Sequence, residues 1–123
     1  DRLPGNRPAA ILQPMLFMKK RFFAAIRSGR KTTTLRFWSR PQVRPGSVHR
    51  VRGLGRVRVT AVERVDEHRL TPQCARADGF RTLAQLRQAL AEMYPPEARE
   101  GKRLYLVSFE YVDDGPNANP NVV

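Results

Sequence analysis

Gly29-Arg30-Lys31-Thr32-Thr33-Thr34-Leu35-Arg36 is the stretch that decides the fold, because a helical pattern gives way there to an extended one. Residues 19–28 have helical spacing of apolar side chains, and a glycine after the last turn is a common helix end. The threonine run then favours a strand. The stretch therefore predicts a helix-to-strand corner rich in hydroxyls and cations, suited to a phosphate, a nucleobase edge or an acyl oxygen. The alternative is a solvated basic strand.

The charge of the whole chain points to a polyanionic partner. Its 123 residues are most consistent with one domain, and they carry a formal net charge of +12. Of the 23 basic residues 19 are arginine, whose planar fork of donors matches phosphates and base edges. We therefore expect RNA, DNA or a membrane surface as partner classes, with RNA favoured. The alternative is a basic surface that serves solubility alone.

Other compositional features favour a soluble, cytoplasmic protein. Cys74 is the single cysteine, so no disulfide can form within the chain. No apolar run reaches the length of a membrane span, and no signal-peptide pattern is present. The chain contains no C-x-x-C, H-x-x-x-H or phosphate-loop motif, so we expect neither a metal nor another cofactor.

The patterns along the chain predict an α+β fold. We expect an N-terminal arm at residues 1–13, the domain at 14–112 and a flexible tail at 113–123. Strands are expected at 14–18, 32–38, 47–52, 56–65 and 103–112, and helices at 19–28, 71–78 and 82–94. The apolar alternation of the fourth strand changes phase at Val62, which indicates a bulge. Short strands of this kind favour a small, curved, mostly antiparallel β-barrel of about five or six strands flanked by two or three helices.

Lys31 and Thr34 are the strongest candidates for catalytic residues. On a regular strand they would point to opposite faces, but they can converge if Lys31 lies in the corner. A desolvated lysine among cations has a lowered pKa and can activate a hydroxyl, which makes Thr34 a candidate nucleophile. Arg36 shares the face of Thr34 and could hold an oxyanion or phosphate. The alternative is an exposed lysine and a structural threonine.

Asp78 is the third candidate catalytic residue. An acid at a helix end is unfavourable to the helix dipole, so we expect Lys31, Arg36 or a substrate amine to hold it, or else a local cap. Trp38 and Arg40 follow the basic stretch and are expected at the rim of the same cleft. Other aromatic residues fit either base stacking or the core; these are Phe37, Tyr94 and Tyr105.

Taken together, these residues resemble an ASCH domain of the PUA-like superfamily. The resemblance rests on the Gly29–Arg36 block, the turn at residues 45–47, Val59–Val62, Asp78-Gly79-Phe80 and the closing strand, and it covers roughly residues 15–112. It implies a small β-barrel with flanking helices and a cleft that binds RNA or nucleosides.

One branch of the family has a similar pattern, namely the bacterial N4-acetylcytidine amidohydrolases. In that branch a lysine, a threonine and a glutamate remove the acetyl group from the cytidine amine. The lysine and threonine fall on Lys31 and Thr34, and the glutamate falls on or beside Asp78, where this chain has the shorter acid. Another ASCH member acts as a ribonuclease, which would use the same cleft.

We therefore predict an ASCH domain, monomeric or weakly dimeric, that binds RNA or a modified nucleoside and acts in RNA processing. Lys31, Thr34 and Asp78 are the predicted catalytic residues. The predicted ligand-binding residues are Gly29, Arg30, Arg36, Trp38 and Arg40. The alternatives are an amidohydrolase on N4-acetylcytidine, a ribonuclease, and a basic module without a nucleic-acid role.

Overall fold

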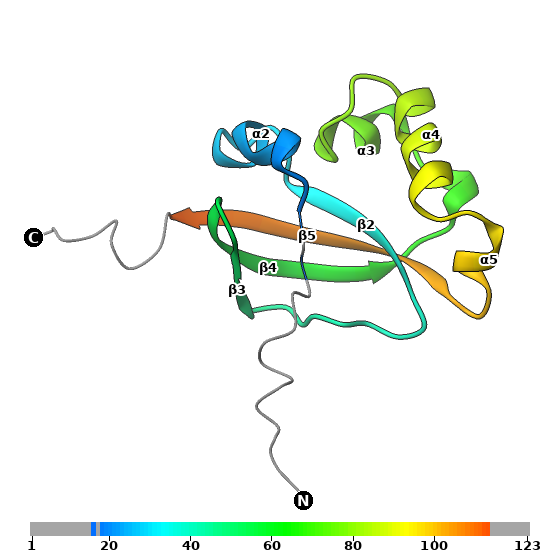
Figure 1. Cartoon of the computed structure of the whole chain (residues 1–123), viewed down its shortest axis with the longest axis horizontal. Helices are drawn as coiled ribbons and strands as arrows, with labels where there is room; N and C mark the ends of the chain where they lie inside the picture. The colour runs from blue at the N-terminus through cyan, green and yellow to red at the C-terminus, as the bar shows by residue number, and fades with distance from the viewer. Residues whose placement is uncertain (1–15, 17, 114–123) are drawn as a thin grey trace, which may run out of the picture.

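The computed structural model describes residue 16 and residues 18–113 (Figure 1). In chain order its elements are η1 (Lys20–Phe22), α2 (Phe23–Arg27), β2 (Thr33–Trp38), β3 (Val48–Val51), β4 (Gly55–Arg64), η2 (Glu67–Arg69), α3 (Pro72–Ala77), α4 (Leu83–Met93), α5 (Pro96–Arg99) and β5 (Arg103–Asp113). The predicted arm and almost all of the predicted tail lie outside the described residues. Within those residues, no helix has the length and apolar character needed to cross a membrane.

The described strands form one antiparallel sheet in the order β2-β5-β4-β3. The sheet curls into a half-barrel, with α2, α3 and α4 along the side of β2 (Figure 1). The α+β antiparallel fold is confirmed, but the described chain has four strands rather than the five or six expected. Leu16 and Met18, from the expected first strand, lie outside any strand and bury their side chains in the core instead.

Two apolar clusters flank the sheet. One lies within the curl and includes Val57, Val59 and Val107, all fully buried. The other joins the outer face of β2, through Leu35 and Phe37, to the helices α3 and α4. β2 is an edge strand of the described sheet, and the candidate site lies between β2, η1 and α4.

The predicted irregularity of the long strand is present in β4. Val59 pairs with Phe109 while Ala61 pairs with Ser108, so Thr60 is an extra residue. This shift lies slightly before Val62, where the sequence pattern changes phase. A bulge bends a strand and increases its twist, which helps a four-stranded sheet to curl.

The helix boundaries follow the capping residues. Thr71 and Thr82 cap α3 and α4 by accepting hydrogen bonds from the backbone N–H groups of Cys74 and Gln85, both at 3.1 Å. The helix α5 is additional to the two or three expected. It forms because Pro96, whose neighbour Pro95 ends the preceding turn, occupies the first position of a new helix, where proline is tolerated.

Candidate active site

The helix-to-strand corner places Lys31 immediately before the edge strand. Gly29 adopts a φ of +83°, a left-handed conformation that favours glycine. The backbone N–H groups of Arg30 and Lys31 then both donate to the carbonyl of Ala25, at 2.9 and 3.0 Å. Since β2 begins at Thr33, Lys31 belongs to the corner, which is the condition under which its side chain and that of Thr34 can converge.

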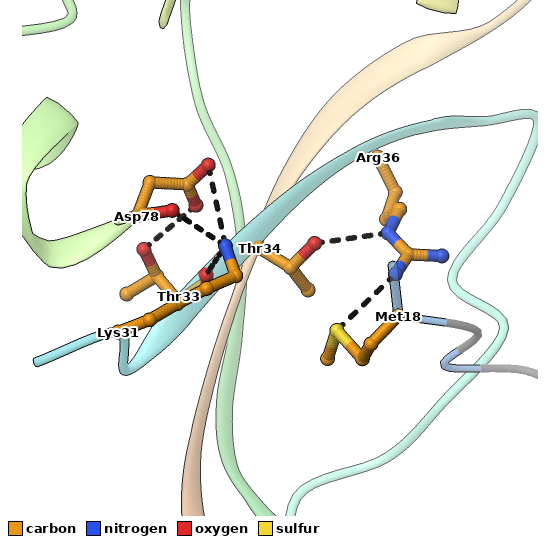
Figure 2. A network of polar contacts seen from close by, with 6 residues as sticks. All are labelled: Met18, Lys31, Thr33, Thr34, Arg36 and Asp78. Carbon is orange, nitrogen blue, oxygen red and sulfur yellow. Dashed lines mark hydrogen bonds and ion pairs between the residues drawn. The ribbon is translucent and has the colours of Figure 1, made fainter. Parts of the chain in front are cut away.

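Lys31 is buried, with only 4% of its surface exposed, and its amine has defined partners. Nζ donates to the backbone carbonyls of Thr33 at 2.8 Å and Asp78 at 2.6 Å (Figure 2). It also lies 3.6 Å from the Asp78 carboxylate and 4.7 Å from the centroid of the Phe22 ring. Of the partners expected for Asp78, Lys31 therefore forms the ion pair.

The buried environment changes the acid–base behaviour of this pair. Burial lowers the pKa of Lys31 from 10.5 to about 8, against the opposing effect of Asp78 and with a contribution from the positive charges of Arg36 and Arg21. Burial also raises the pKa of Asp78, although the nearby Lys31 opposes that change. A neutral lysine amine has two N–H donors, and both carbonyl contacts can use them. Its lone pair then remains available to accept a proton.

Thr34 is held by a different partner. Arg36 Nε donates to Thr34 Oγ1 at 3.0 Å, and Arg36 also lies against the sulfur of Met18 at 3.8 Å (Figure 2). Because Thr34 Oγ1 accepts this bond, its own proton must point elsewhere. In the described chain no hydrogen bond joins Lys31 Nζ to Thr34 Oγ1. Catalytic hydrogen bonds are often long or poorly aligned without substrate and tighten when it binds.

Thr33 fixes the carboxylate of Asp78 through a hydrogen bond. Its hydroxyl donates to Asp78 Oδ1 at 2.9 Å, while Oδ2 faces Lys31. Both Thr33 and Asp78 are buried. Asp78 is the C-cap residue of α3 and caps the helix through its backbone N–H, while its side chain is held by the strand and the corner.

One pocket brings the candidate residues together. Lys31, Thr34, Arg36 and Asp78 all line it, and its cavity volume is about 220 Å³. The remaining walls come from the Met18–Phe22 segment, from Phe80 and from the face of α4. They include the apolar and aromatic side chains of Leu86, Leu90, Met93 and Tyr94. The walls are thus mostly apolar, with the cations Lys19 and Arg21 on one side, and the floor is polar.

The other predicted ligand-binding residues lie elsewhere. Arg30 lines a second, adjoining hollow. Trp38 packs on the core within the curl and against Tyr105, with ring centroids 6.0 Å apart. Arg40 is exposed in the loop after β2. Neither Trp38 nor Arg40 lines the pocket, and Gly29 contributes through its backbone conformation rather than as a wall.

Two residues of the site were not singled out by the sequence. Phe22 fits the apolar side of the first helical segment, but its ring lies beside the Lys31 amine and makes an edge contact with Phe80 at 5.5 Å. Thr33 is one of three consecutive threonines, and nothing in the local pattern distinguishes it from Thr32. Among the described residues, no group of three or more His, Cys, Asp or Glu side chains could hold a metal ion.

Gly79 supports the site through close packing, and this yields a stability prediction. Its φ is +95°, and a Cβ there would lie 3.2 Å from both Lys31 Cδ and Phe22 Cδ1. Gly79→Ala should lose about 1–2 kcal/mol to backbone strain and more from displacing Lys31 and Phe22. Thermal unfolding should therefore occur at a lower temperature.

Gly101→Ala is the matched control, because Gly101 has a φ of +75° and no atom lies within 4 Å of the position that a Cβ would take. It should show the strain without the packing defect. Equal loss of stability in the two variants would contradict close packing between Gly79 and the lysine.

Comparisons with known proteins identify relatives of this chain in sequence and in fold. The chain is 37% identical over 100 residues to the N(4)-acetylcytidine amidohydrolase of Klebsiella pneumoniae (strain 342), across 74% of this chain and 89% of that protein. Its fold is similar to the crystal structure of an ASCH domain from Lactobacillus crispatus, with a TM-score of 0.62 and 16% identity over 72% of this chain and 68% of that one. A protein of Enterococcus faecalis is similar at a TM-score of 0.57 and 22% identity, over 76% of this chain and 71% of the other. No protein-family model matches the sequence.

Proposed function

The chain belongs to the N(4)-acetylcytidine amidohydrolase family of ASCH-domain proteins, and on that premise we propose that it hydrolyses the amide of N4-acetylcytidine to cytidine and acetate. The observation that carries the proposal is the convergence of Lys31, Thr34 and Asp78 on one small pocket. These are the three residues for which the family pattern implies a catalytic role.

The proposed reaction begins with Thr34. The neutral amine of Lys31 accepts the hydroxyl proton as Thr34 Oγ1 attacks the acetyl carbon, which gives a tetrahedral intermediate. When the C–N bond breaks, the Lys31 ammonium returns the proton to the departing amine of cytidine. Water then attacks the threonine ester while Lys31 accepts one of its protons. When the bond between the acetyl carbon and Thr34 Oγ1 breaks, the Lys31 ammonium returns that proton to Thr34 Oγ1, and acetic acid leaves and ionises to acetate. The pKa of Lys31, about 8, suits a group that must both accept and release a proton near neutral pH.

Arg36 and Asp78 support these steps in different ways. Arg36 fixes the rotamer of Thr34 through the 3.0 Å bond and supplies a positive charge where the oxygen becomes negative. Asp78 is a positioning residue in this scheme, because its carboxylate contacts Lys31 and Thr33. A direct role of Asp78 at the leaving amine stays a prediction.

The dimensions of the pocket favour a single base over a longer ligand. Pockets that enclose drug-sized ligands usually measure about 300–1,000 Å³, whereas this one measures about 220 Å³. Its apolar walls, with the rings of Phe80 and Tyr94, suit a flat pyrimidine. The polar floor lies at one end, where the acyl group would have to reach Thr34.

Incubation of the protein with N4-acetylcytidine tests the proposal. We expect release of equimolar cytidine and acetate, resolved by liquid chromatography, and no cleavage of a cytidine-containing RNA under the same conditions. RNA cleavage without deacetylation would instead favour the ribonuclease alternative.

Binding of N4-acetylcytidine without turnover would contradict hydrolysis and favour a nucleoside-binding role. The first explanation to test would then be the shorter acid at position 78. Because the aspartate side chain has one methylene fewer than glutamate, its carboxylate would hold the Lys31 amine in a different position. In that case Asp78→Glu should create activity. If Asp78→Glu also binds without turnover, the chain is a binding protein.

A further inference from the structure

A second hollow adjoins the candidate active site. It is lined by residues of η1 and α2, by the segment after α3, and by α4. It shares Arg21, Phe22, Phe80 and Ala89 with the first pocket, so the two spaces meet at these residues. Its cavity volume, about 470 Å³, is larger than that of the first pocket. The two spaces are therefore neighbours, and a ligand that reached from one to the other would pass the Phe22–Phe80 ring pair.

The two spaces differ in chemistry. The first has mostly apolar walls, although cations such as Lys19 and Arg21 also line it. The polar lining of the second consists of Arg21, Arg30, Gln85, Gln88 and Glu92. Two arginines against one glutamate leave it positive. Gln85 Oε1 accepts from the backbone N–H of Arg81 at 3.1 Å and Gln88 Nε2 donates to Glu92 at 3.2 Å, so each amide keeps its other polar atom for a ligand. Phe22 and Phe80, in edge contact at 5.5 Å, stand at the junction. Arginine forks bind phosphate oxygens in pairs, and glutamine amides can bind sugar hydroxyls.

We propose that this second hollow is a ribose-phosphate subsite, so that the favoured ligand is an N4-acylated cytidine that carries a phosphate, as a mononucleotide or within RNA. The inference rests on the proposed function for the base pocket only. It assigns Arg30 and Arg21 to the phosphate and the α4 glutamines to the sugar. A free nucleoside carries no phosphate and would supply no anion to these two arginines.

Arg30 is the better residue to test, because Arg21 also influences the acid–base behaviour of Lys31. Binding of cytidine, cytidine 5′-monophosphate and cytidine 3′-monophosphate is measured by calorimetry, which needs no turnover. We expect one monophosphate to bind about 10- to 100-fold more tightly than cytidine, as a charged hydrogen-bonding pair would give. Arg30→Ala should remove most of that preference.

Two further variants test whether the phosphate preference arises in the second hollow or from the net charge of the protein. Arg52→Ala removes the same charge from an exposed turn between β3 and β4 and should keep the preference. Glu92→Gln removes the negative charge from the hollow and should increase it. A short cytidine-containing RNA distinguishes the source of the phosphate, because tighter binding than either mononucleotide identifies polymeric RNA.

Equal affinity for cytidine and both monophosphates would overturn the subsite, even if acetylcytidine is hydrolysed. So would loss of the preference in Arg52→Ala to the same extent as in Arg30→Ala, since the effect would then reflect net charge alone. A phosphate preference that depends on Arg30 supports the subsite whether or not the deacetylation occurs.

Discussion

Thr34→Ala should abolish the release of cytidine from N4-acetylcytidine, with kcat lower by about 10³-fold or more. The variant removes the atom that would form the bond to the acetyl carbon, while Lys31 and Asp78 keep their contacts with each other and with Thr33. Substrate binding should persist because the walls of the pocket are unchanged. The measurement is a steady-state assay with the two parameters, kcat and KM, determined separately.

Thr32→Ala is the matched control, since Thr32 is an exposed threonine two residues away that does not line the pocket. It should retain full activity. Thr34→Ser keeps a hydroxyl that can still accept from Arg36 Nε, and it should retain activity within about 10-fold. Mass spectrometry of the wild-type protein during turnover should detect an acetyl group on Thr34. Substantial activity of Thr34→Ala, together with no acetylated protein, would mean that water attacks the amide directly.

The fold was largely predictable because its main signals are local. The glycine of the corner, the threonine caps of α3 and α4, and the alternation in β4 and β5 each fix an element from a few neighbouring residues. The number of strands was overestimated for the opposite reason. The apolar run around Leu16 and Met18 fits a strand or buried irregular chain equally well, and tertiary packing decides between them.

The candidate site was predictable to the extent that one short stretch contains it. Lys31, Thr34 and Arg36 fall within six residues of each other, and the family resemblance added Asp78. The contacts of Phe22 and Thr33 could not be predicted from the sequence, because they depend on how the corner packs against the end of α3, some 45 residues later. Trp38 was expected at the cleft because it is close in sequence to Lys31 and Thr34, but its half-buried ring packs against the core cluster and does not line the pocket.

Lys31→Met should lower kcat by about 10²- to 10⁴-fold, the usual contribution of a general base. Wild-type activity should rise about tenfold per pH unit below the pKa of Lys31, about 8, and level off above it. Activity increases with pH because only the neutral Lys31 amine can accept the proton of Thr34. The fraction of protein molecules with a neutral amine grows as the pH rises towards the pKa of Lys31. The residual activity of Lys31→Met should not show this rise.

The single variant also leaves the buried Asp78 carboxylate without its cation, and breaking a buried ion pair can cost about 3–5 kcal/mol of stability. Lys31→Met combined with Asp78→Asn removes both charges, and the asparagine oxygen can still accept from Thr33. This double variant should unfold at a temperature close to that of the wild type and remain inactive, whereas Lys102→Met, at an exposed lysine, should be fully active. The double variant therefore distinguishes a loss of activity from a loss of stability. A stable double variant with wild-type kcat would remove Lys31 from the chemistry. A pH profile that is already level through neutral pH would assign the base to another group.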